Sequence, residues 1–126
     1  MRADAQASVD RINAALDLLR TSLNWDVALR RLDELNARVE DPTLWDDQAQ
    51  AQAVMQERRR LDESVTAARQ IKQEMEDTLE FIEMAEEEDD AELADEGATT
   101  LAQLADRADR DKVQALLSGE ADAFDT

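Results

Sequence analysis

Apolar side chains recur at alternating steps of three and four along most of the chain, the spacing that places them on one face of an α-helix. The first stripe predicts a helix over residues 3–22, and the second predicts a helix over residues 26–40. The two stripes consist of Val9, Ile12, Leu16, Leu19 and Leu23, and of Leu29, Leu32, Leu35 and Val39. Between them, Asn24 and Asp26 carry side-chain oxygens that suit a helix N-cap.

The longest stripe predicts a third helix over residues 46–86. Its members are Val54, Arg58, Leu61, Val65, Ala68, Lys72, Met75, Leu79 and Ile82. Ile71 beside Lys72 indicates that the stripe drifts, as a period of 3.6 residues requires. The second helix should stop at Asp41-Pro42, because proline disfavours helical geometry in the residue before it. Thr43 and Asp46 resemble a weak capping box for the third helix, and Asp46 alone is an equally good cap.

Five consecutive acids, Glu86, Glu87, Glu88, Asp89 and Asp90, follow this helix. Their mutual repulsion disfavours a continuing helix, and either aspartate can cap a new one, so we expect a turn. A fourth helix is expected over residues 90–117, with a weaker stripe of Leu93, Leu101, Leu104, Ala105, Ala108, Ala115 and Leu116. Ser118-Gly119 predicts its end, and residues 118–126 are expected to form a junction.

Short turns between long helices make sequence neighbours antiparallel. We therefore expect an all-α fold of four helices in one domain, residues 1–126. The third and fourth helices should form a long, coiled-coil-like hairpin, and the first two a shorter hairpin packed on one end of it. Because the short helices reach only the half of the third helix nearest Pro42, the acidic turn should lie at a two-stranded tip. A composition with two Gly, one Pro and 3% aromatic residues agrees with this fold class.

The net charge of −18 is unevenly distributed. Residues 1–60 hold nine Arg and eleven acids, whereas residues 61–126 hold five basic residues and twenty-one acids. Affinity for phosphates depends on Lys and Arg, so the second half should repel nucleic acid. We expect no strong direct nucleic-acid binding by this domain alone.

The residue types needed for most catalysis are missing. The sequence has no Cys, His or Tyr, which removes thiolate chemistry and the commonest general base, so the composition argues against an enzyme. The acidic residues 83–96 could be interpreted as a cation site, but they lack the spacing of a calcium-binding loop, and we expect no metal and no cofactor. No apolar run is long enough to span a bilayer or resembles a signal peptide, which favours a cytoplasmic protein without membrane contact.

Two charged clusters are the candidate partner-binding residues: the acids Glu86, Glu87, Glu88, Asp89 and Asp90, and the bases Arg58, Arg59 and Arg60. The acids serve either as a docking surface or simply as a solvated turn. The arginines suit phosphates or carboxylates of a partner, but intrachain pairing four residues apart is the favoured interpretation, as in Arg58 with Asp62, Arg59 with Glu63, and Arg30 with Glu34. Trp25 and Trp45 are expected to close the ends of the core, although exposed anchors are the alternative.

Three stretches resemble the N-terminal region of the peptide chain release factor 2 family. They are Leu29 to Pro42 followed by Leu44-Trp45, Met55 to Leu61, and Leu117 to Asp122. Together they span most of the chain in the same order and spacing. The Asp-Pro-x-Leu-Trp and Ser-Gly-Glu stretches are the most specific.

This resemblance implies a part in termination at UAA and UGA codons. In the family, a Ser-Pro-Phe tripeptide reads the codon and a Gly-Gly-Gln loop promotes peptidyl-tRNA hydrolysis; this sequence contains neither. The resemblance therefore implies a non-catalytic domain that docks on the ribosome at the stalk base, near ribosomal protein L11. The alternative is a free-standing acidic coiled-coil adaptor or inhibitor that mimics nucleic acid.

Overall fold

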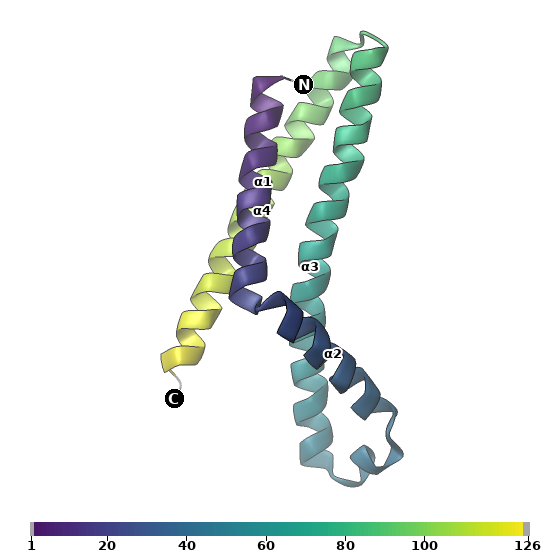
Figure 1. The fold of residues 1–126 in the computed structure, drawn as a ribbon, viewed down its shortest axis with the longest axis vertical. Coiled ribbons are helices and arrows are strands. Elements are labelled where there is room, and N and C mark those ends of the chain that lie inside the picture. Colours follow the sequence, from purple (N-terminus) through teal and green to yellow (C-terminus); the bar gives the residue numbers. More distant parts are fainter. Residues whose placement is uncertain (1, 125–126) are drawn as a thin grey trace. The chain divides into compact units, whose positions relative to one another are not determined.

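The residues that the structure describes form four α-helices and one short 3-10 helix, and the path of the chain is shown in Figure 1. The computed structural model describes residues 2–124, and side chains over residues 2–117. In chain order the elements are α1 (Ala3–Leu23), α2 (Trp25–Glu40), η1 (Pro42–Asp46), α3 (Gln48–Glu87) and α4 (Ala91–Phe124). The described residues contain no strand, and the predicted all-α class is confirmed.

The helices group into two compact units. The first contains the chain up to Ser22 and the chain from Ala68 onward, that is, α1, the second half of α3, and α4. The second unit is Leu23–Ala67, which holds α2, η1 and the first half of α3. Organisation as one domain stays a prediction.

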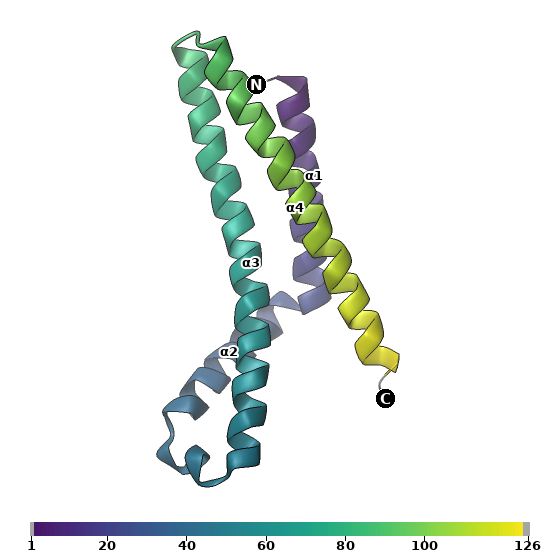
Figure 2. The same ribbon diagram turned by 180° about the vertical axis from the view of Figure 1, so that it is seen from behind.

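In the first unit, α3 and α4 form the predicted antiparallel hairpin, and α1 runs alongside α4 in the same direction (Figures 1 and 2). Arg11 donates from Nη2 to Asp106 at 2.9 Å and to Asp109 at 2.6 Å, and Arg2 forms an ion pair with Asp95. The expectation of a two-stranded tip is therefore wrong, because α1 reaches the part of α4 that follows the turn.

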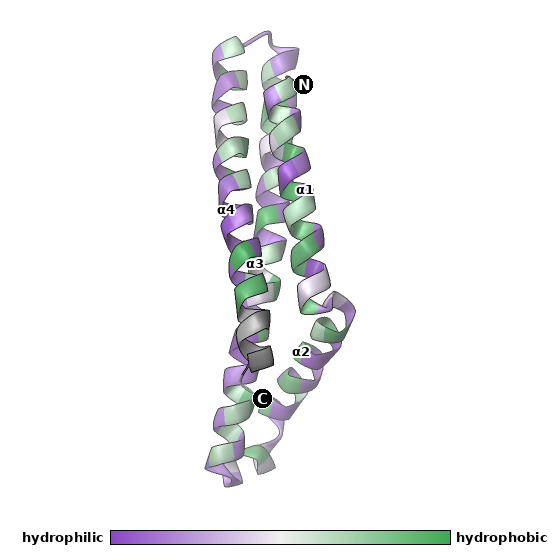
Figure 3. Cartoon of the chain, turned by 90° about the vertical axis from the view of Figure 1, so that its left-hand side faces the viewer, coloured by the Kyte–Doolittle hydropathy of each residue, from purple (hydrophilic) through white to green (hydrophobic). Residues whose placement is uncertain are grey.

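Alternating hydrophobic and hydrophilic positions mark every helix (Figure 3). In the first unit Ile71 is fully buried and Lys72 is exposed, which confirms the drift of the stripe. Small residues that the stripes did not include are also buried, namely Ala5, Ala15, Ala85, Ala94 and Ala98. Leu116 is 44% exposed, so the predicted stripe of the fourth helix is wrong at its end.

Gly97 allows α3 and α4 to approach closely. A Cβ atom placed on Gly97 would lie 2.4 Å from Cγ1 of Ile82 and 3.3 Å from Cδ1 of Phe81. Carbon atoms at optimal contact are about 3.5–4.0 Å apart, so a side chain here would overlap Ile82. Glycine is unfavourable in the middle of a helix, and at Gly97 this cost is offset by the close contact that it allows.

The turn between α3 and α4 follows a Schellman pattern. Asp89 adopts the left-handed conformation with φ 54°, its N–H donates to the Glu86 carbonyl, and the Asp90 N–H donates to the Ala85 carbonyl. The Asp90 carboxylate accepts from the Leu93 N–H at 3.1 Å, which makes it the N-cap of α4. The expected turn and aspartate cap are both confirmed.

The second unit has a small core between α2 and the first half of α3. Its buried residues are Leu35, Leu44, Ala51 and Val54, and Val39 and Leu61 pack against them. Arg31 joins the two helices by a bidentate ion pair with Glu57, from Nε at 2.6 Å and from Nη2 at 2.8 Å. The Arg31 guanidinium lowers the pKa of Glu57, and the two carboxylates of Glu57 and Glu34 raise the pKa of Arg31.

The helix starts in the second unit differ from those expected. Asn24 makes no side-chain cap bond and instead supplies a left-handed residue with φ 53°, which asparagine tolerates well. The Asp41 carboxylate accepts from Thr43 N at 3.0 Å and Thr43 Oγ1 at 2.8 Å, which starts η1 and lowers the pKa of Asp41. Asp47, not Asp46, then caps α3 by accepting from Gln50 N at 3.2 Å.

The predicted end of the last helix at Ser118-Gly119 is also wrong, because α4 continues to Phe124. Glycine after a helix favours a stop without enforcing one. The Glu and Ala residues that follow Gly119 have high helix propensity, which allows the helix to continue.

Candidate functional site

The structure places the two charged clusters on different units. Residues 86–90, the acidic tip, form the α3–α4 turn of the first unit, where Glu86 to Asp89 are exposed and Asp90 is half-buried. Asp89 and Asp90 shape the turn through backbone conformation and capping. The side chains of Glu87 and Glu88 are therefore the members best placed to meet a partner.

The arginine cluster, Arg58 to Arg60, lies on the α3 part of the second unit. Arg58 is half-buried and donates from Nε to Oδ1 of Asn36 on α2 at 2.6 Å, which fixes the direction of its guanidinium. Arg59 and Arg60 are exposed, and within the described part of the chain their side chains form no ion pair or hydrogen bond.

The favoured intrachain pairs of these arginines are not formed among the described residues. Arg58 bonds to Asn36 instead of Asp62, and Glu34 pairs with Arg31 at 3.2 Å instead of with Arg30. Arg58 bonds across to α2 because Asn36 lies within its reach, whereas exposed pairs four residues apart contribute only about 0.3–0.5 kcal/mol. The prediction that the cluster is neutralised within its own helix is wrong.

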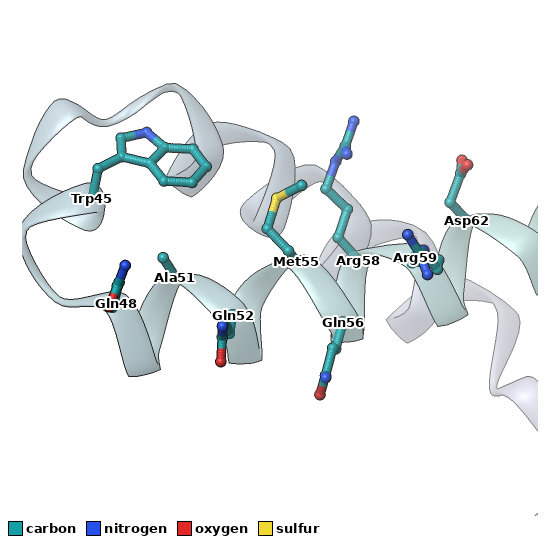
Figure 4. Close-up of a pocket in the computed structure, with 9 residues that line it drawn as sticks. All are labelled: Trp45, Gln48, Ala51, Gln52, Met55, Gln56, Arg58, Arg59 and Asp62. Carbon is teal, nitrogen blue, oxygen red and sulfur yellow. The ribbon is translucent and has the colours of Figure 1, made fainter.

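Trp45 is 53% exposed, so the expectation that it closes the core is wrong for this residue. It borders an open groove, the tryptophan groove, lined by η1 and by α3 side chains from Gln48 to Asp62 (Figure 4). In this view the Trp45 indole, the Met55 thioether and the Arg58 guanidinium project on the same side of α3. Trp25 is half-buried, between the two alternatives considered for it.

Met55 also lines this surface, and the predicted stripe of the third helix does not include it. It is 37% exposed and follows Val54, a buried member of the stripe. An apolar residue directly beside the stripe and close to an exposed Trp is the signal that could have indicated a groove.

Three features are absent from the described residues. No group of three or more carboxylates there is arranged to hold a metal ion. Every buried side-chain nitrogen or oxygen of the described residues has a hydrogen-bond partner. The described helices also include none that is long and apolar enough to cross a membrane.

Comparison with known proteins gives a consistent result over the chain. The PCRF domain family matches residues 28–126. Peptide chain release factor 2 of Roseobacter denitrificans is 47% identical over 126 residues, all of this chain and 34% of the relative. The release factor 2 of Caulobacter vibrioides is 52% identical over 102 residues, 81% of this chain and 28% of the relative.

A more distant relative agrees: release factor 2 of Rickettsia bellii is 38% identical over 123 residues, 98% of this chain and 33% of the relative. The chain thus spans about a third of the length of the curated relatives it matches.

Proposed function

The chain belongs to the PCRF domain family and is homologous over its whole length to bacterial peptide chain release factor 2, and from this we propose that it serves translation termination as a ribosome-docking domain. Its role is to position a release factor on the ribosome, in the cytoplasm, without chemistry of its own. The observation that carries the proposal is the 47% identity over all 126 residues to a protein named as a release factor 2.

The residues of the chain support a role in docking over one in catalysis. The sequence lacks the Ser-Pro-Phe and Gly-Gly-Gln motifs to which the family owes codon reading and hydrolysis, and it has no His or Cys. Its described side chains hold no cluster suited to a metal ion. The chain does have exposed charged surfaces on well-packed helices, and a partner can bind to these.

The proposed neighbour is the ribosomal stalk base with its L11 protein, in a factor that acts at UAA and UGA codons. The candidate contacts are the acidic tip, through Glu87 and Glu88, and the arginine cluster, through Arg59 and Arg60. The side chains of these four residues are exposed; the two acids lie at a capped turn and the two arginines on α3.

A chimera tests this function. Residues 1–126 replace the matching third of the Roseobacter denitrificans release factor 2, and peptide release is measured on ribosomes programmed with UAA, UGA or UAG. The expected result is release at UAA and UGA within a few-fold of the parent, whereas deletion of the matching third lowers release strongly. A chimera no better than the deletion contradicts the proposal.

The isolated chain is the second arm of the experiment. We expect it to give no release at any codon. Codon-dependent release by the chain alone would overturn the non-catalytic assignment. The rival role, a free-standing acidic adaptor that mimics nucleic acid, predicts instead that the chain binds basic proteins through the acidic tip and that the chimera is inactive.

A further inference from the structure

The tryptophan groove presents apolar surface and unpaired cations side by side, in a chain where cations are scarce. The sequence holds 32 acids against 14 basic residues, so a cation without an internal partner is unexpected. Arg59 is exposed and makes no ion pair with the described residues, although acids are abundant around it in the sequence. Glu57, the nearest acid in sequence, is already occupied by Arg31.

A hydrogen bond to Asn36 orients the Arg58 side chain. Its Nε–H donates to Asn36 at 2.6 Å, and no further bond of its guanidinium is formed within the described residues. The two Nη atoms therefore remain available to a carboxylate, and the side chain has lost much of its freedom before binding. Preorganisation of this kind lowers the entropic cost of association.

The apolar part of the groove is exposed to water. Trp45 is 53% exposed and Met55 is 37% exposed, and both project on the same side of α3 as Arg58 (Figure 4). Trp and Met are both enriched in protein interfaces, and Trp together with Arg dominates their energetic hot spots. An apolar side chain placed against Trp45 and Met55 would bring a neighbouring carboxylate within reach of Arg58 and Arg59.

We infer that the tryptophan groove binds a protein segment that presents an apolar side chain beside one or more carboxylates. This inference rests on the proposed function, since it assigns the groove as the surface that meets a ribosomal protein. A nucleic acid is the other chemistry that Trp and Arg can bind. It is disfavoured because the charged residues that line the groove are two arginines and one aspartate, Arg58, Arg59 and Asp62, which suit one or two carboxylates better than the run of phosphates that strong nucleic-acid binding needs.

Binding of the purified 126-residue chain to purified ribosomes tests the inference. Arg59→Glu and Trp45→Ala should each weaken binding by about ten-fold or more, which corresponds to about 1.4 kcal/mol. Met84→Ser and Arg110→Glu are matched controls on the first unit, where Met84 is 51% exposed and Arg110 is also exposed, and both should bind as the original chain does. Urea unfolding of every variant separates lost binding from lost folding, and Arg59→Glu removes no bond of the folded chain.

A photoreactive benzoylphenylalanine in place of Met55 identifies the partner's class. We expect cross-linking to a ribosomal protein, at a peptide that contains Asp or Glu, and loss of the product on adding Arg59→Glu. Cross-linking to ribosomal RNA overturns the assignment of a protein partner. Binding that survives both groove substitutions overturns the groove while leaving the proposed function intact, whereas absence of binding by the unsubstituted chain contradicts the proposed function and the inference with it.

Discussion

Gly97→Ala measures how closely α3 and α4 pack. The new Cβ would lie 2.4 Å from Cγ1 and 3.1 Å from Cδ1 of Ile82, a side chain that is only 3% exposed. Because Cγ1 is one bond from Cβ, it cannot move aside without a change of rotamer or a shift of the helices. Overpacking of this kind costs about 1–3 kcal/mol.

Helix propensity acts in the opposite direction. Alanine is more favourable than glycine in a helix by about 1 kcal/mol. The two effects leave an expected net loss of about 1 kcal/mol in the free energy of unfolding, which for a chain of this size lowers Tm by about 4 °C. Urea unfolding followed by circular dichroism at the helical band is the assay.

A double-mutant cycle with Ile82→Ala isolates the contact. Ile82→Ala alone should cost about 2–5 kcal/mol, and it should cost at least about 1 kcal/mol less when Ala occupies position 97, because the added methyl group fills part of the space. A Gly97→Ala chain that is more stable than the original by the full propensity gain, with no coupling to Ile82, would refute the close packing.

Three further predictions concern the ion pair of the second unit and the acidic tip. Arg31 lowers the pKa of Glu57 below its unfolded value of 4.5, so the pair stabilises the fold above that pH, and this stability is lost as pH falls through the folded pKa. Glu57→Gln should therefore lower the free energy of unfolding at pH 7 and reduce its pH dependence below pH 4.5, as measured by urea titrations. An unchanged pH profile would contradict the pairing. Asp89→Gly should stabilise by about 0.5 kcal/mol, because glycine relieves a left-handed conformation at φ 54°, and a loss in the urea midpoint would count against that strain. The double change of Glu87 and Glu88 to Gln should raise the free energy of unfolding by on the order of 0.3 kcal/mol or leave it nearly unchanged, because acids at a helix C-terminus oppose its dipole. A fall in Tm of several degrees would indicate that the two acids make structural contacts.

The helices and the acidic turn could be predicted because their signals are local. A stripe such as Val9, Ile12 and Leu16 encodes a helix face directly, and five consecutive acids mark a turn within a few residues. The path of α1 alongside α4 could not be predicted, because the pairs of Arg11 with Asp106 and Asp109 join residues far apart in the sequence. The length of a loop does not determine against which neighbouring helix the next helix packs.

The candidate site was predictable in composition but not in arrangement. Most residues of both charged clusters are exposed as their composition indicates, yet the sequence could not show that Arg58 would bond to Asn36 of another helix. Trp45 was expected in the core because indoles usually are buried, and a short helix started by Asp41 left it 53% exposed instead. Such outcomes depend on which side chains the fold brings together, and periodicity does not determine this.

Competition on the ribosome tests the central claim most directly. A fluorescently labelled chain is bound to ribosomes that carry a stop codon, and unlabelled full-length release factor 2 of Caulobacter vibrioides is added. The account predicts saturable binding and complete displacement of the chain, because both occupy the same docking position. A chain that does not bind, or that stays bound while the release factor saturates the ribosome, would contradict it.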